Sequence, residues 1–388
     1  MNIIKKALFK FLVWLPYPIK KNRLFFSSIP TMSDNCLALY YYIKENHNNK
    51  YDIYWQINKG DKNKLGYKKV VYKSGNIFQK IKYYHYLKSS HIIVITHHQL
   101  PIRKGQKLIT LWHGEPFKKW SNDVSHLVYD SHDNWFVTSN ENTKKIRSDV
   151  YRLKNVNFIT SPQCRLWFFQ KKDLIDAVSD YLYSLSIRKF LVFMPTFKGI
   201  GREDNFFDVD FKLIDNTLEK NDAFLFIKLH PHYSLDSYKF LNTYNRIRFV
   251  DNRFFENNNL ELYSFLALSS GLITDISSVF IDYMFLDKPI CFYLNEPKTI
   301  FEKTIFETFN YPLPGVMALN SADLNTFIEN VCSPEQQNGV LDLKENKLIE
   351  FYRPNNSDLS SGPKVVEDLI NSIIFKKRKK EHEKNSID

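Results

Sequence analysis

Short apolar runs alternate with polar, helix-like stretches along most of the chain. The first series comprises residues 23–27, 51–55, 91–96, 107–112 and 134–139. A second series comprises residues 188–194, 223–229, 248–250, 271–275 and 289–293. Short runs that are apolar throughout are typical of strands buried on both faces of a sheet. Two successive strand–helix series predict an α/β protein with two domains, each built on a parallel sheet.

The N-terminal end of the chain has a different pattern. Apolar side chains between residues 3 and 15 recur every three or four positions, with Lys5, Lys6 and Lys10 off that face, and Pro16 follows. This pattern predicts an amphipathic helix within residues 1–21 that lies in the headgroup layer of a membrane. The alternative is a helix that packs on the protein's own core. No run reaches the roughly 18–20 apolar residues that a membrane span needs.

These patterns predict four parts of the chain. They are the helix in residues 1–21, a first domain in 22–180, a second domain in 181–375 and a basic tail in 376–388. The polar, helix-like stretch 171–187 is the expected link between the domains, and residues 364–375 have a helical pattern.

The distribution of charged residues along the chain agrees with this division. The chain has 388 residues with 54 Lys and Arg against 42 Asp and Glu, a net charge of +12. Residues 1–24 contain six basic and no acidic side chains, and residues 376–388 contain six basic against three acidic ones. Most of the excess therefore lies at the ends, which favours attraction to an anionic membrane surface. A solvated tail is the alternative for residues 376–388. Nucleic acid is not expected as a partner, because most aromatic residues lie in the strand-like runs.

Metal, disulfide and cofactor signatures are weak or missing. The four cysteines are far apart and form neither a disulfide pattern nor a zinc-binding spacing, which indicates a reducing compartment. Asp208-Val-Asp210 is a weak metal candidate in a Phe-rich stretch. There is no phosphate-binding P-loop, dinucleotide-binding glycine motif or nucleophile elbow. We expect neither a metal nor a cofactor.

Candidate chemistry follows the ends of the predicted strands, where open α/β sheets bind ligands. His113, followed by Gly114, comes directly after the run 107–112 and is a candidate general base. The alternative is a structural, hydrogen-bonded histidine. Thr196 and Lys198 follow the first run of the second series.

Two further strand ends in the second series carry polar groups. His230 and His232 flank Pro231 after the run 223–229, and Lys198 or His230 is suited to neutralise a phosphate. The richest segment has polar side chains at four positions at and just beyond the end of the run 271–275: Thr274, Asp275, Ser277 and Ser278. A helical pattern begins there, so we expect both serines at a helix N-terminus, where free amides favour phosphate. The alternative is that they only cap the helix.

Taken in order, four of these segments resemble motifs of the CDP-glycerol glycerophosphotransferase family of teichoic acid primases and polymerases. The matching stretches are Leu111–Lys119, similar to the family's W-H-G-x-P-x-K, Met194–Lys198, similar to its A-P-T-[FY]-R, Leu229–His232, and Ile273–Tyr283 with Leu286–Pro289. The resemblance implies a GT-B fold, in which two Rossmann-like domains face each other across a cleft. It also implies transfer of glycerol phosphate from CDP-glycerol to a hydroxyl of a lipid-linked saccharide or growing polymer, with release of CMP. The product would be a teichoic acid or a capsular polymer, made at the cytoplasmic face of the cell membrane by a peripheral enzyme.

The resemblance also implies roles for the candidate residues. His113 and His230 would be catalytic, and Gly114, Glu115 and Lys118 would lie on the acceptor side. The donor-binding residues would be Thr196, Lys198, His232, Thr274, Asp275, Ser277 and Ser278.

The sequence also departs from the family's pattern. Lys198 stands where the family usually has Arg, Glu115 where it has Thr or Ile, and Ser161-Pro-Gln-Cys-Arg165 where it has G-x-P-R-N-D. Two alternatives stay open: a GT-B transferase that uses CDP-ribitol or another nucleotide-activated donor, and a non-catalytic scaffold that binds membranes or polyanions.

Overall fold

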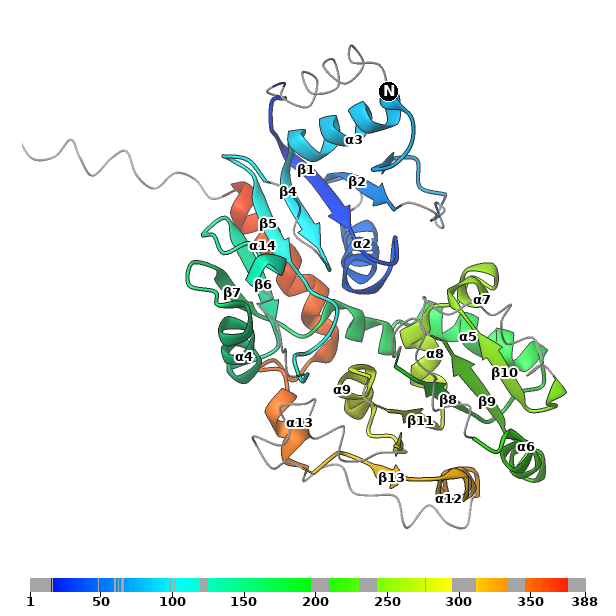
Figure 1. Cartoon of the computed structure of the whole chain (residues 1–388). Helices are drawn as coiled ribbons and strands as arrows, with labels where there is room; N and C mark the ends of the chain where they lie inside the picture. Colours follow the sequence, from blue (N-terminus) through cyan, green and yellow to red (C-terminus); the bar gives the residue numbers. More distant parts are fainter. Residues whose placement is uncertain are drawn as a thin grey trace, which may run out of the picture.

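Two parallel sheets form the framework of the computed structural model, one in each lobe of the chain (Figure 1). The structure describes residues 15, 17–47, 49–58, 61, 63, 66–97, 100, 102–118, 125–196, 209–229, 243–275, 277–294, 312–333 and 346–375. The fold is α/β, as the apolar runs predict, and GT-B-like, as the family resemblance implies.

The first sheet has seven strands in the order β3-β2-β1-β4-β5-β6-β7, all parallel. Its strands are β1 (Lys20–Ser27), β2 (Asp52–Ile57), β3 (Val70–Tyr72), β4 (Ser90–Ile95), β5 (Lys107–Thr110), β6 (Asn134–Thr138) and β7 (Asn157–Thr160). The associated helices are α2 (Asp34–Asn46), α3 (Ile77–Ser89), η1 (Ser125–Leu127), α4 (Glu141–Tyr151) and η2 (Cys164–Phe169).

Alternation along β1 explains how this sheet is covered. Leu24 and Phe26 pack into the core that includes α2, whereas Phe25, between them, packs against Tyr83 of α3. Successive side chains of a strand point to opposite faces, so an uninterrupted apolar strand requires cover on both sides. Asn76 and Asn140 begin α3 and α4 with capping boxes, which satisfy amides that a helix start leaves free.

The second sheet has six parallel strands in the order β10-β9-β8-β11-β12-β13. They are β8 (Phe190–Met194), β9 (Phe224–Lys228), β10 (Ile247–Val250), β11 (Gly271–Thr274), β12 (Ile290–Tyr293) and β13 (Val316–Ala318). Its helices are α6 (Phe211–Lys220), α7 (Asn252–Asn257), α8 (Leu262–Leu268), α9 (Val279–Tyr283), η5 (Met284–Leu286) and α12 (Ser321–Cys332).

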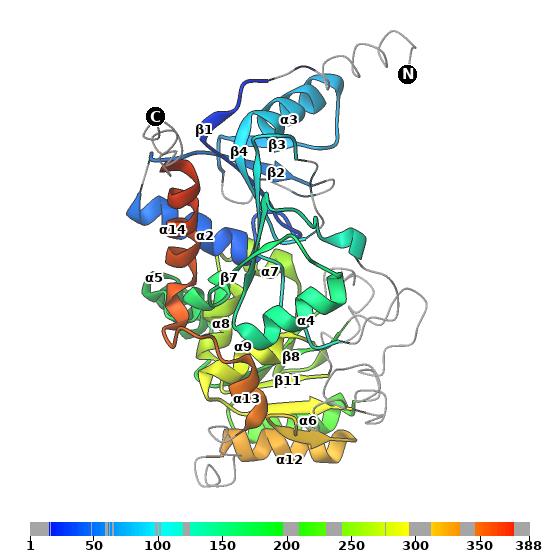
Figure 2. The same ribbon diagram turned by 90° about the vertical axis from the view of Figure 1, so that its left-hand side faces the viewer.

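The chain crosses between the lobes and then returns. Helix α5 (Lys172–Ser184) leads from the first sheet to the second, as expected for residues 171–187. After α13 (Lys347–Tyr352) and η8 (Leu359–Ser361), helix α14 (Gly362–Phe375) packs against α2, and both views place it on the first lobe (Figures 1 and 2). There Glu367, 2% exposed, accepts a hydrogen bond from Tyr51 (3.0 Å). The range 181–375 groups this helix with the second domain by chain order, whereas in space it lies on the first.

All ten strands expected from the apolar runs are present, and β3, β7 and β13 are additional. The predicted N-terminal helix falls almost wholly on residues outside the described part, as does the tail 376–388. Within the described ranges, no helix combines the length and the apolar character needed to cross a bilayer.

Strand order determines where the candidate residues meet. Each sheet changes winding direction once, between β1 and β4 in the first and between β8 and β11 in the second. The carboxyl ends of strands at such a switch point open into the crevice where α/β proteins bind ligands. His113 follows β5, next to β4, while Thr196 and Asp275 follow the adjacent strands β8 and β11. The fold thus brings distant segments to two facing sheet edges.

Candidate active site

His113 lies at the carboxyl edge of the first sheet and has a defined tautomer. Its Nδ1 is 3.0 Å from the main-chain oxygen of Thr96. A carbonyl oxygen can only accept, so Nδ1 carries the proton and Nε2 keeps its lone pair. Burial lowers the pKa of His113 below its ordinary value of 6.5, so the ring is neutral at pH 7. This histidine is therefore prepared to accept a proton.

Aromatic neighbours fix the orientation of this ring. His97 stacks on His113 with ring centroids 4.0 Å apart and planes 7° apart, and Trp112 stacks on it at 4.7 Å. Trp112 has a left-handed backbone (φ 59°), an uncommon conformation for a residue with a bulky side chain. The chain thus takes a sharp turn directly before the histidine.

The Glu115 side chain anchors the loop that follows β5 to the first domain through hydrogen bonds. Its carboxylate is 5% exposed and accepts hydrogen bonds from Ser139 Oγ (2.5 Å) and Gln163 Nε2 (2.7 Å). The fully buried Arg147 lies 3.5 Å away and donates to the main-chain oxygen of Gly114 (2.6 Å). The Glu115 side chain therefore points into the interior of the first domain.

Gly114 and Lys118 occupy different surroundings. A Cβ placed on Gly114 would lie 3.0 Å from Ser278 Oγ, so this glycine faces the second domain at close range. The Lys118 ammonium is 5.5 Å from the centre of the Phe117 ring. Phe117 in turn packs edge-on against Phe280 of α9, with centroids 5.6 Å apart. The loop after β5 thus contacts the second domain at two places.

The edge of the second sheet brings together three predicted donor-binding residues. Thr196 donates to Asp275 Oδ1 from both its main-chain nitrogen (2.9 Å) and its hydroxyl (2.5 Å). Thr274 donates from its hydroxyl to the main-chain oxygen of Met194 (2.8 Å). These bonds join the ends of β8 and β11 at the switch point of the sheet.

Ser277 and Ser278 precede α9 at this edge. Ser278 is the N-cap residue of the helix, yet its side chain makes no capping bond to the described residues. Capping therefore does not use the Ser278 hydroxyl. The helix is only five residues long, Val279–Tyr283, so its contribution to anion binding would come from local amides and hydroxyls rather than from a long helix dipole.

One buried ionic cluster spans the two domains next to this edge. Arg165 Nη1 donates to Asp34 Oδ1 (2.8 Å) and to the main-chain oxygen of His113 (3.0 Å). Its Nη2 donates to Asp282 Oδ2 (2.7 Å), which also accepts from the Tyr263 hydroxyl (2.8 Å). Burial raises the pKa of Asp282 to about 6, although the Arg165 charge acts in the opposite direction.

Sequence reasoning did not select the members of this cluster as site residues. In the sequence, Arg165 ends the stretch 161–165 that departs from the family's motif, and Asp282 lies within the matching stretch Ile273–Tyr283. The available signal was a lone charged residue at the start of the apolar stretch Cys164–Phe169. Lys198, His230 and His232 lie outside the residues that the structure describes.

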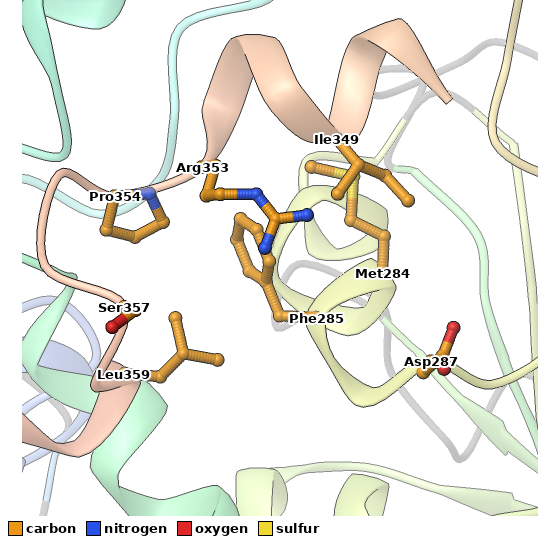
Figure 3. A pocket seen from close by; sticks show the side chains of 8 residues that line it. All are labelled: Met284, Phe285, Asp287, Ile349, Arg353, Pro354, Ser357 and Leu359. Carbon is orange, nitrogen blue, oxygen red and sulfur yellow. The ribbon is translucent and has the colours of Figure 1, made fainter. Parts of the chain in front are cut away.

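A separate pocket of about 230 Å³ lies between η5 and the chain around α13 (Figure 3). Its lining residues are Met284, Phe285, Asp287, Ile349, Arg353, Pro354, Ser357 and Leu359. None of the predicted site residues lines it. Among the described residues, no group of three His, Cys, Asp or Glu side chains could hold a metal ion.

Comparison with solved structures identifies the same two-domain fold. A structure of a variant of the wall teichoic acid polymerase TagF superposes with a TM-score of 0.73 at 18% identity and covers 97% of this chain and 94% of that one. A second TagF variant, soaked with CDPG, gives a TM-score of 0.72 at 17% identity over 95% and 93% of the two chains.

Curated sequences give a consistent picture. Residues 8–357 match the family model described as CDP-Glycerol:Poly(glycerophosphate) glycerophosphotransferase. The teichoic acid ribitol-phosphate polymerase TarL of Staphylococcus aureus is 25% identical over 383 residues, which are 91% of this chain and 63% of TarL. The teichoic acid poly(glycerol phosphate) polymerase of Bacillus spizizenii is 25% identical over 372 residues, covering 87% and 89%. This chain thus spans less than two thirds of the length of TarL.

Proposed function

Because the chain belongs to the CDP-glycerol:poly(glycerophosphate) glycerophosphotransferase family, we propose that it transfers glycerol phosphate from CDP-glycerol to a hydroxyl group. The acceptor is a lipid-linked saccharide or a growing polymer in the synthesis of a teichoic acid or capsular polymer, and CMP is released. The observation that carries the reaction is His113, whose Nε2 is left as a proton acceptor at the carboxyl edge of the first sheet.

The chemistry is a direct in-line displacement. An acceptor hydroxyl attacks the β-phosphorus of the donor, and its proton passes to His113 Nε2. A new O–P bond forms as the bond from the β-phosphorus to the bridging oxygen breaks, and CMP leaves with the electron pair. No covalent enzyme intermediate is needed.

The donor is proposed to lie against the edge of the second sheet. The hydroxyls of Ser277 and Ser278 bind the pyrophosphate, and the Thr196–Asp275 pair with Thr274 shapes the loop around it. The leaving phosphate requires positive charge, which is assigned to Lys198 and His230, while His232 is assigned to donor binding. On the acceptor side, Gly114 and Lys118 belong to the loop that carries His113.

CDP-ribitol is the second candidate donor. Relatives described as ribitol-phosphate enzymes match this chain as well as those described as glycerol-phosphate enzymes, with 25% identity in each of the two polymerases above. The test is a parallel titration of CDP-glycerol, CDP-ribitol and a UDP-sugar with a synthetic lipid-linked disaccharide. We expect CMP release and a product heavier by glycerol phosphate. A ribitol phosphate increment identifies the second candidate, and UDP release alone refutes both.

The reaction is proposed to occur at the cytoplasmic face of the cell membrane. The support is the placement of basic residues in the segments 1–24 and 376–388, which suits an anionic membrane surface that carries the lipid-linked acceptor. A non-catalytic scaffold would bind the same surface without using His113. The variant His113→Ala separates the two ideas, because only an enzyme loses CMP release while staying folded and membrane-bound.

A further inference from the structure

Arg165 is the residue through which the two domains share one buried ionic cluster. It lies in η2 of the first domain, 4% exposed, and Asp282 lies in α9 of the second, 1% exposed. The 2.7 Å bond between them crosses from one lobe to the other. Tyr263 of α8 adds a second contact from the second domain, with its ring centroid 5.3 Å from the guanidinium carbon.

The same guanidinium also holds the loop that carries the proposed base. Arg165 Nη1 donates to the main-chain oxygen of His113, and the main-chain nitrogen of Arg165 donates to Asn35 Oδ1 (2.9 Å). Asn35 in turn donates to the main-chain oxygen of Trp112 (2.9 Å). Arg165 thus holds the main chain of His113, and Asn35, which Arg165 contacts, holds the main chain of Trp112.

The geometry requires the planar fork of arginine. Three acceptors surround Nη1 and Nη2: Asp34, the His113 carbonyl and Asp282. An arginine presents several N–H groups in a fixed plane, whereas a lysine ammonium is a single point charge. One ammonium at the same place could not hold acceptors from both domains in the same relative positions.

The cluster also lies beside a close approach of the His113 loop to the second domain. A Cβ on Gly114 would lie 3.0 Å from Ser278 Oγ and 3.7 Å from Arg165 Nη2. Ser278 directly precedes α9, which carries Asp282. A shift of Asp282 relative to Arg165 would therefore change the spacing between the His113 loop and the serine loop.

We propose that Arg165 is a positioning residue, which holds the His113 loop in register with α9 and so sets the distance between the base and the donor held at Ser277 and Ser278. This inference rests on the proposed function, because it assigns a purpose to the spacing between those loops. The role assigned to Arg165 is exerted through these loops and includes no contact with the substrate or the transferred group.

The test combines Arg165→Lys with a matched control. Displacing a catalytic group by about 1 Å costs on the order of 100-fold in rate. We expect Arg165→Lys to lower kcat for CMP release by about that factor, with the KM for the donor changed less than about threefold. The control is Arg23→Lys, another buried arginine, which pairs with Asp52 inside the first domain (2.8 Å). It should lower the unfolding temperature while leaving kcat unchanged.

A second measurement is independent of turnover. Hydrogen exchange of residues 111–117 should become faster in Arg165→Lys and in the near-isosteric variant Asp282→Asn, but not in Arg23→Lys. Asp282→Asn also serves if Arg165→Lys does not fold. For Arg165→Ala, guanidinium ion at a non-denaturing, millimolar concentration should restore part of the lost kcat, which a purely structural role would not predict.

The outcomes separate the two levels of inference. If the wild-type protein releases CMP and Arg165→Lys and Asp282→Asn both keep normal kcat and normal exchange, the positioning role is refuted and the proposed function stands. If the wild-type protein turns over neither CDP-glycerol nor CDP-ribitol, the proposed function fails, and with it the purpose assigned to Arg165. Faster exchange in that case would establish only a structural coupling of the two loops.

Discussion

Replacing Glu115 by Leu should destabilise the first domain strongly, because it leaves a charge buried without its partner. Arg147 has no exposed surface, and its Nε and Nη1 atoms have no hydrogen-bond partner among the described residues. Glu115 is the carboxylate beside it, with the nearest nitrogen and oxygen atoms 3.5 Å apart. Glu115→Leu also removes the acceptor of Ser139 and Gln163.

The magnitude follows from this geometry. Removing one partner of a buried ion pair typically costs about 3–5 kcal/mol of unfolding free energy, because the other charge stays buried. For a domain of 150–250 residues this corresponds to a fall in unfolding temperature of roughly 10 °C. The double variant Glu115→Leu with Arg147→Met should recover most of the loss, because neither charge then stays behind.

Urea unfolding followed by tryptophan fluorescence measures these differences. Glu115→Gln keeps an oxygen for Ser139 and Gln163 and removes only the charge, so it should be intermediate. Glu141→Gln is the control, since Glu141 pairs with Lys144 at the surface, with the two side chains 68% and 39% exposed. It should change stability by less than about 0.5 kcal/mol. If Glu115→Leu costs no more than this control, the ion-pair argument is wrong.

Three further predictions concern activity and binding. Burial lowers the pKa of His113 below 6.5, and the neutral ring is the active base, so kcat/KM for CMP release should be flat above pH 6.5 and fall towards acid. A profile that still rises at pH 8 would contradict this assignment. The variant His113→Asn should lower the rate by about 10²–10⁴-fold. Gly114→Ala places a Cβ 3.0 Å from Ser278 Oγ on a backbone with φ 159°, so we expect both kcat and the unfolding temperature to fall, measured by steady-state kinetics beside thermal unfolding. Deleting residues 1–21 should abolish co-sedimentation with anionic vesicles, whereas neutral vesicles serve as the control; unchanged sedimentation would remove the membrane role of that segment.

The apolar runs predicted the fold well because burial on both faces produces a strong local signal. Phe25 and Phe26 are both fully buried on opposite faces of β1, and runs of this kind exist in each strand that was expected. The missed strands lack this signal. All four residues of β7 are only half-buried, and β3 and β13 are three-residue strands at sheet edges. Edge strands have a neighbour on one side only, so their sequences need less apolar character.

The candidate site was predictable at strand ends and not beyond them. The positions of His113, Thr196 and Asp275 at the sheet edges were predictable because parallel strands align their carboxyl ends. Arg165 and Asp282 were not found, because their pairing joins residues 117 positions apart in different domains. Nothing in the local pattern of either segment specifies a partner in the other. The placement of α14 on the first domain has the same cause, since Glu367 meets Tyr51 from 316 positions away.

The departures from the family's motifs become intelligible once their contacts are considered together. Glu115, in the first motif, accepts a hydrogen bond from Gln163, which lies in the departing stretch 161–165 (2.7 Å). Gln163 accepts from Asn35 (2.6 Å), and Asn35 accepts from the main chain of Arg165. Residues that differ from the family's pattern are therefore linked to one another through one buried network. A small residue at position 115 would leave the Gln163 amide and the Arg147 charge without this carboxylate, so the changes are consistent as a set. In this chain a connected polar network beneath His113 supports the loop, and its last member, Arg165, is the one that reaches the second domain.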